Sequence, residues 1–262
     1  MQCRGALFRT AITAAVVVLA APAVATAGAW NLPKGDGLVI LKYEPVKASN
    51  RYNESGQSEP LMRQHTEEIV SLWGEYGLTD RITLMAKTDW QDSVDEYYDF
   101  QGRGLLEVGA RVQVLKTDHS VLSVQMVYGH DGDGRNATWA EPGQGEHESE
   151  ARVLFGRGFD FRYHSYFEAQ LARRWRDGLP DETRWEMAFG VDLNPKWSVL
   201  TQVYAGKVDT AGQDGGAKWT KIETGIIRHM DDWSLQAGWR RTASGRRIVD
   251  GDGIVVALWR RF

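Results

Sequence analysis

Apolar and polar residues alternate along most of the chain. One parity of segment 104–115 carries Val108 and Val112. The other parity carries Glu107 and Arg111. Because successive side chains of a β-strand point to opposite faces, the alternation predicts strands with one apolar face and one charged face.

Twelve segments show this alternation, and together they cover most of the chain after residue 36. They are 37–45, 66–76, 81–90, 104–115, 120–130, 148–157, 162–175, 183–193, 197–207, 218–228, 233–242 and 249–262. The parity of 37–45 and of 197–207 is ambiguous, so which of their side chains share a face stays open.

The connections between these segments alternate in length. Five are short and rich in turn-forming residues: 77–80, 116–119, 158–161, 194–196 and 229–232. Six are longer and polar: 46–65, 91–103, 131–147, 176–182, 208–217 and 243–248. Short turns at one end, long loops at the other and an even strand count are typical of bacterial outer-membrane barrels. We therefore predict an all-β fold, a closed transmembrane antiparallel β-barrel of about 12 strands in an up-and-down meander.

The first 27 residues have the features of a cleaved signal peptide. Arg4 and Arg9 precede an apolar run at 11–21, and small residues follow, so cleavage after Ala27 or Ala29 fits equally well. The barrel domain is then 28–262. The single cysteine of the chain lies in the signal, so the exported domain has none. A net charge of −4 without a basic block argues against nucleic-acid binding.

Aromatic residues at the strand ends favour a membrane over water as the medium outside the sheet. Indole rings prefer the interface between lipid and water. The predicted interface aromatics are Trp90, Trp175, Trp197, Trp219, Trp233, Trp259 and the terminal Phe262. A final strand that ends on an aromatic residue also resembles the C-terminal strand of outer-membrane barrels, which implies recognition by the barrel assembly machinery. A soluble all-β fold with the apolar face inside is the alternative.

The polar parity supplies candidate lumen residues. They are Lys87, Glu107, Arg111, Gln113, Gln125, Arg152, Glu168, Arg174, Arg184, Glu186, Gln202, Glu223, Gln236 and Arg240. These side chains could form a selectivity path for a hydrophilic solute. They could equally form an internal network of ion pairs that fills the barrel and conducts nothing.

Signals for catalysis and metal binding are weak. The six histidines include no close pair at metal-ligand spacing. The fragments at 131–134 and 250–253 (both DGDG) resemble parts of calcium loops, but Arg135 and Pro142 stand at ligand positions of the first, and both are interpreted as solvated loop turns. His130 could meet a loop serine across the rim, which leaves an outer-membrane lipid-modifying enzyme as a minor alternative. We predict no catalytic residue, no metal and no cofactor.

Three motifs together resemble a group of proteobacterial "transporter-like" outer-membrane barrels. They are the start at 27–35 (AGAWNLPKG), the turn at 75–81 (EYGLTDR) and the ending at 258–262 (LWRRF). The resemblance implies an outer-membrane location in a Gram-negative bacterium, in a group linked with aromatic-compound degradation or exopolysaccharide production. We expect a narrow porin-like channel for a hydrophilic solute or an exported polysaccharide. A non-conducting structural or attachment barrel is the main alternative. The expected partners are outer-membrane lipid and the transported solute.

Overall fold

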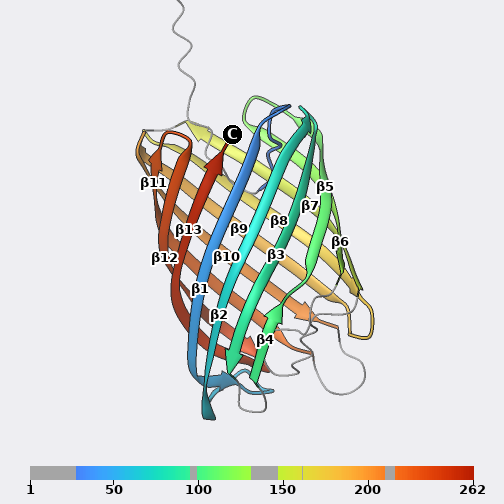
Figure 1. Ribbon diagram of the computed structural model, residues 1–262, viewed down its shortest axis with the longest axis vertical. Helices are drawn as coiled ribbons and strands as arrows, with labels where there is room; N and C mark the ends of the chain where they lie inside the picture. The colour runs from blue at the N-terminus through green and yellow to red at the C-terminus, as the bar shows by residue number, and fades with distance from the viewer. Residues whose placement is uncertain (1–27, 95–98, 131–146, 161, 210–215) are drawn as a thin grey trace, which may run out of the picture.

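The described residues of the computed structural model, which are 28–94, 99–130, 147–160, 162–209 and 216–262, form one antiparallel sheet. The sheet closes on itself with tilted strands (Figure 1). The strands are β1 (Gly37–Tyr52), β2 (Ser58–Thr79), β3 (Ile82–Val94), β4 (Asp99–Arg103), β5 (Leu106–Lys116), β6 (Ser120–His130), β7 (His147–Asp160), β8 (His164–Arg176), β9 (Glu182–Asn194), β10 (Trp197–Val208), β11 (Lys218–Met230), β12 (Trp233–Arg246) and β13 (Ile248–Arg261).

The wall of the barrel has twelve strand positions, as predicted. β5 pairs with residues 82–87 of β3 and β4 pairs with residues 90–94, so β4 and β5 occupy a single position. β1 pairs with β2 on one side and with β13 on the other, and the pairing of β2 with β3 completes the circle. Every other strand pairs with its neighbours in sequence. The up-and-down meander is confirmed.

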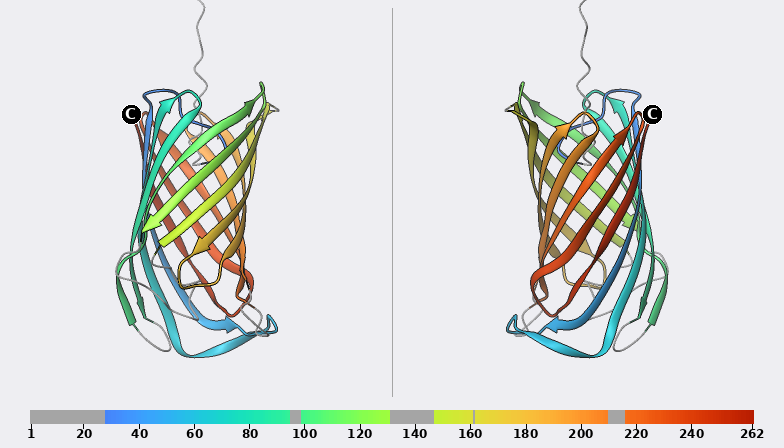
Figure 2. Two further views of the ribbon diagram at one scale, coloured as in Figure 1. Left: turned by 90° about the vertical axis from the view of Figure 1, so that its right-hand side faces the viewer. Right: turned by 90° about the vertical axis from the view of Figure 1, so that its left-hand side faces the viewer.

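Several predicted loops are strands in the structure. Residues 46–65 and 243–248 were expected to be loops, yet most of them extend β1, β2, β12 and β13. The β1–β2 hairpin consequently extends beyond the other described strands, at the bottom of both views in Figure 2. The prediction was wrong there because apolar alternation detects only the part of a strand that has an apolar face. Beyond that band, strands still pair although both faces carry polar residues.

The apolar face of the sheet points outward. Val108 and Met126 expose 49% and 59% of their surface, whereas the charged Arg111 and Glu168 expose 1% and 2%. This arrangement is the reverse of a soluble barrel, in which apolar side chains fill the centre. An outer wall of apolar side chains around a polar interior is what hydrocarbon lipid requires.

No helix in the described residues is long and apolar enough to cross a membrane.

The predicted interface aromatics divide into two groups. Trp90, Trp175, Trp233 and Phe262 face outward with exposed fractions of 42% to 65%. Trp197 is also on the outer face, where the Arg228 guanidinium lies 5.5 Å from its ring. The remaining two, Trp219 and Trp259, line the internal cavity and do not meet lipid. Their position at strand ends suggested an interface, but their parity places them inside.

A charge on the outer wall should cost most near the middle of the apolar band. We predict that Met126→Arg lowers the free energy of unfolding by about 2–4 kcal/mol in lipid vesicles. Leu115→Arg, also outward but next to the short turn after β5, should cost no more than about 1 kcal/mol. Denaturant titration of the barrel refolded into vesicles measures both. Equal costs at the two positions would contradict a lipid-facing wall.

Candidate functional site: the lumen

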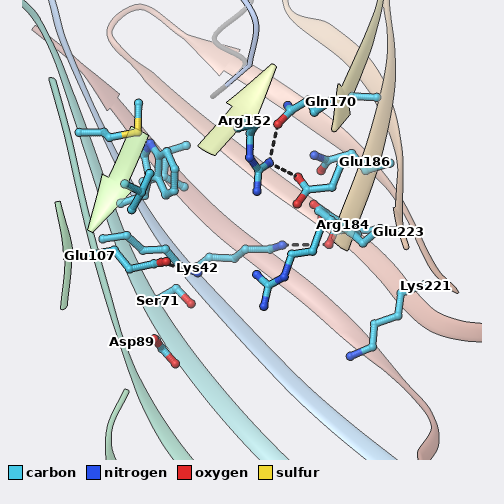
Figure 3. Close-up of a pocket in the computed structure, with 18 of the residues that line it drawn as sticks. Lys42, Ser71, Asp89, Glu107, Arg152, Gln170, Arg184, Glu186, Lys221 and Glu223 are labelled. Atoms are coloured by element: carbon cyan, nitrogen blue, oxygen red, sulfur yellow. Dashed lines mark hydrogen bonds and ion pairs between the residues drawn. The ribbon is translucent and has the colours of Figure 1, made fainter. Parts of the chain in front are cut away.

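The barrel encloses a cavity of about 440 Å³ (Figure 3). Thirteen of the fourteen predicted lumen residues line this cavity, and Gln113 does not. The cavity also has charged lining residues that the sequence analysis did not select: Lys42, Glu44, Asp89, Glu148, Glu150 and Lys221. Most of these were detectable in principle, because Asp89, Glu148 and Glu150 lie an even number of residues from selected neighbours on the same strand. Lys42 and Glu44 fall in the segment whose parity was ambiguous.

One wall of the lumen is organised around Arg174 on β8. Its guanidinium lies 2.7 Å from a carboxylate oxygen of Glu107, 2.7 Å from one of Glu148 and 2.9 Å from one of Glu150. Arg152 on β7 continues this Arg174 cluster, with distances of 2.9 Å to both Glu150 and Glu186. Because inward side chains of neighbouring strands lie side by side, four strands contribute to one ion-pair network.

A second network, centred on Glu223 of β11, lies beside the first around the barrel. Lys42 extends from β1 across β13 and β12 to reach Glu223 at 2.8 Å (Figure 3). The Arg240 guanidinium lies 3.2 Å from the same carboxylate and 2.5 Å from Glu44. It also packs over the ring of Tyr204, with 4.6 Å to the ring centroid. Because Lys42 also lies 3.2 Å from Glu44, both Glu44 and Glu223 are shared by two cations.

The charges that line the cavity balance. The basic residues are Lys42, Lys87, Arg111, Arg152, Arg174, Arg184, Lys221 and Arg240. The acidic residues are Glu44, Asp89, Glu107, Glu148, Glu150, Glu168, Glu186 and Glu223. A charge held away from bulk water is costly unless an opposite charge compensates it. Equal numbers on interlocking strands meet that requirement.

Residues 28–32 lie inside the end of the barrel that carries the short turns, and the exposed residues 33–36 connect them to β1 at the rim (Figure 2). The amide of Ala29 donates a hydrogen bond of 2.9 Å to Glu168, and the hydroxyl of Ser123 donates one of 2.7 Å to the Ala29 carbonyl. The amide of Leu32 donates to the hydroxyl of Thr83 at 3.0 Å. We call residues 28–32 the N-terminal plug. Strand alternation could not reveal it, because it is not a strand.

Apolar contacts also hold the plug in place. Trp30 packs edge-on against Tyr166 with 6.0 Å between ring centroids. Gly156 provides space for the indole, since a Cβ atom there would lie 2.7 Å from the Trp30 ring. Trp30 and Leu32 join an inward cluster that includes Leu38, Ile40, Leu200, Ile227 and Trp259. The end of the lumen near the short turns is thus partly filled by the plug and this apolar cluster, and most of the lumen charges lie beyond it.

The enzyme alternative rests on His130 and a loop serine across the rim. His130 lies on the outer face, where its ring is 4.8 Å from the ring of His147. Elsewhere, the Ser198 hydroxyl lies 2.7 Å from Nε2 of His229 and 2.6 Å from Asp192. That arrangement contains the residue types of a hydrolase, but Ser198 is only 2% exposed and does not line the cavity. Its contacts connect neighbouring strands near the short turns.

No protein-family model matches the chain, and no curated protein matches it. Several solved structures are similar to it. The COG4313 outer membrane channel from Pseudomonas putida F1 is similar over 91% of this chain and 100% of that chain, with a TM-score of 0.71 and 15% identity. The NanC porin is similar over 84% of this chain and 98% of its own, with a TM-score of 0.57 and 7% identity. The translocator domain of the autotransporter NalP from Neisseria meningitidis is similar over 88% and 90%, with a TM-score of 0.52 and 12% identity.

The fold is that of a bacterial outer-membrane β-barrel, in agreement with the resemblance found in the sequence. The three similar structures are described as a channel, a porin and a translocator domain. The same architecture therefore serves more than one task, and the contents of the lumen have to distinguish between them.

Removing Arg174 should destabilise the barrel strongly, because three carboxylates would lose their shared cation. We predict that Arg174→Met lowers the free energy of unfolding by about 3–5 kcal/mol. The exposed pair of Arg63 and Asp99 provides the control, and Arg63→Met should cost no more than about 1 kcal/mol. Denaturant titration in vesicles measures both. A cost for Arg174→Met as small as that of the control would contradict the compensating role of this network.

Loosening the plug should widen the path through the barrel. In planar bilayers, Trp30→Ala combined with Leu32→Ala should raise the single-channel conductance, because both side chains anchor the plug to the inward apolar cluster. Lys34→Ala is the matched control, since its side chain is exposed. Unchanged conductance in the double variant would show that the plug does not limit the path.

Proposed function

We propose that this protein is a narrow, passive channel for small hydrophilic solutes across the outer membrane. The observation that carries the proposal is the polar cavity of about 440 Å³ inside a wall whose outer face is apolar. A barrel of twelve positions lies between small barrels filled by side chains and sixteen-stranded porins with open channels. Its lumen is accordingly wide enough for a solute and narrow enough for side chains to select it.

The dimensions and charge of the lumen define the solute class. A cavity of this volume matches molecules of the size of a monosaccharide or an amino acid. Because basic and acidic side chains balance, the lumen should favour neither anions nor cations strongly and should accept polar neutral or dipolar solutes. The N-terminal plug occupies one end, which favours small solutes over an extended polysaccharide. No step in such passive transport needs a cofactor.

The non-conducting barrel remains the second candidate, and it also has support. The Arg174 cluster and the network around Glu223 bind their members tightly to one another, and the plug fills part of the lumen. Both features would suit a structural or attachment barrel that displays its loops at the cell surface and conducts nothing. Channel recording separates the two candidates directly.

Ion selectivity tests the proposed channel. In a potassium chloride gradient across a planar bilayer, the wild-type protein should give a reversal potential close to zero. Lys42→Gln combined with Lys221→Gln should shift it toward cation selectivity, because two positive charges leave the cavity lining. Lys34→Gln combined with Lys116→Gln changes the total charge equally at exposed positions outside the cavity and should leave the potential unchanged.

Liposome swelling with neutral monosaccharides complements the electrical measurement. Swelling that depends on the folded barrel supports a solute channel. A folded barrel that neither conducts nor admits sugars would overturn the proposal and favour the structural candidate.

A further inference from the structure

The outer wall carries a polar hollow of about 380 Å³ at the end opposite the short turns. It crosses the neighbouring strands β2, β1, β13 and β12. The register of β1 shifts between Lys47 and Asn50, and this irregularity lies within the hollow. Its main polar residues are Lys47, Asn50, Gln64, Arg241, Asp250 and Asp252.

The hollow begins where the lipid-facing band ends. Lys47 and Arg241 both pair in register with Asp252, so the three residues form one row across β1, β13 and β12. Trp239 and Ile254 form the next row toward the middle of the barrel, and they expose 49% and 47% of their surface. Residues two apart on a strand share a face, so the charged row lies directly beyond apolar side chains on the same outer face. In a membrane, this is the level of the lipid headgroups.

The two cations of this row are not held in an ion pair. Within the described parts of the chain, neither Lys47 nor Arg241 has a carboxylate oxygen within 4.0 Å, although Asp252 lies between them in the row. Two other arginines at the polar end of the barrel do form ion pairs, since Arg63 lies 3.0 Å from Asp99 and Arg173 lies 2.9 Å from Asp181. Two cations at headgroup level that are not engaged in an ion pair can bind the anionic group of a lipid.

We propose that the hollow binds the phosphorylated sugar headgroup of an outer-leaflet glycolipid. Lys47 and Arg241 bind the phosphate through charge-assisted hydrogen bonds. Asp252, Asn50 and Gln64 bind the sugar, because a carboxylate and two amides accept from and donate to hydroxyl groups. The acyl chains of the lipid then lie over the apolar row of Trp239 and Ile254. The mixture of cations with hydroxyl-binding groups fits a phosphorylated sugar better than a glycerophospholipid or free phosphate.

Native mass spectrometry of the full barrel in detergent tests the proposal. The probe is lipid A carrying both phosphates, compared with its dephosphorylated form and with phosphatidylglycerol. Lys47→Ala combined with Arg241→Ala should weaken binding of phosphorylated lipid A by at least about tenfold, because charged hydrogen bonds to the phosphate are lost. Lys47→Arg combined with Arg241→Lys should retain binding. Lys116→Ala combined with Lys196→Ala, two exposed cations near the short turns, is the matched control and should bind like the wild type.

The possible results are distinct. Equal binding by the wild type and the Lys47/Arg241 alanine variant overturns the site. Equal binding of the phosphorylated and dephosphorylated forms overturns phosphate recognition, and preference for phosphatidylglycerol overturns the choice of a glycolipid. The site lies outside the lumen, so the conductance of the variants is expected to match that of the wild type. A negative result for lipid binding would therefore leave the proposed channel function unaffected.

Discussion

Hydrocarbon lipid forms no hydrogen bonds, and this constraint determines the rest of the structure. Every backbone amide and carbonyl within the membrane must find its partner in the sheet, and only a closed sheet leaves no free edge. The pairing of β2 with β3 provides that closure. Strands that are paired on both sides have no freedom in the direction of their side chains, so alternate residues must face lipid and lumen.

The polar interior follows from the apolar exterior. Because one face of each strand is committed to lipid, charged residues can lie only inside or beyond the membrane. Inside, they need partners, and the Arg174 cluster and the network around Glu223 provide them across several strands. These contacts join strands that are far apart in the sequence, such as β1 and β11. The ion pairs therefore hold the circular cross-section as well as satisfying the charges.

The strand positions were predictable from the sequence where lipid and lumen impose opposite demands. β6 matches its predicted segment, 120–130, because both of its faces lie within the membrane-spanning part. The parts of β1 and β2 next to their hairpin were missed, because water on both faces of the sheet there removes the alternation of apolar and polar residues. Most lumen residues followed from parity alone. The plug did not, because its position depends on contacts such as Ala29 with Glu168 that no local pattern encodes. Trp219 and Trp259 show that parity is a better guide to burial than position at a strand end.

The pairing of the lumen charges bears on how a charged molecule would travel through the barrel. Each guanidinium of the Arg174 cluster already has carboxylate neighbours, so an incoming anion must displace one of them before it binds. Passage would then be a series of substitutions between partners, similar to movement along an ion-exchange resin. A molecule carrying both signs could replace an entire pair in one step and leave no charge uncompensated behind it.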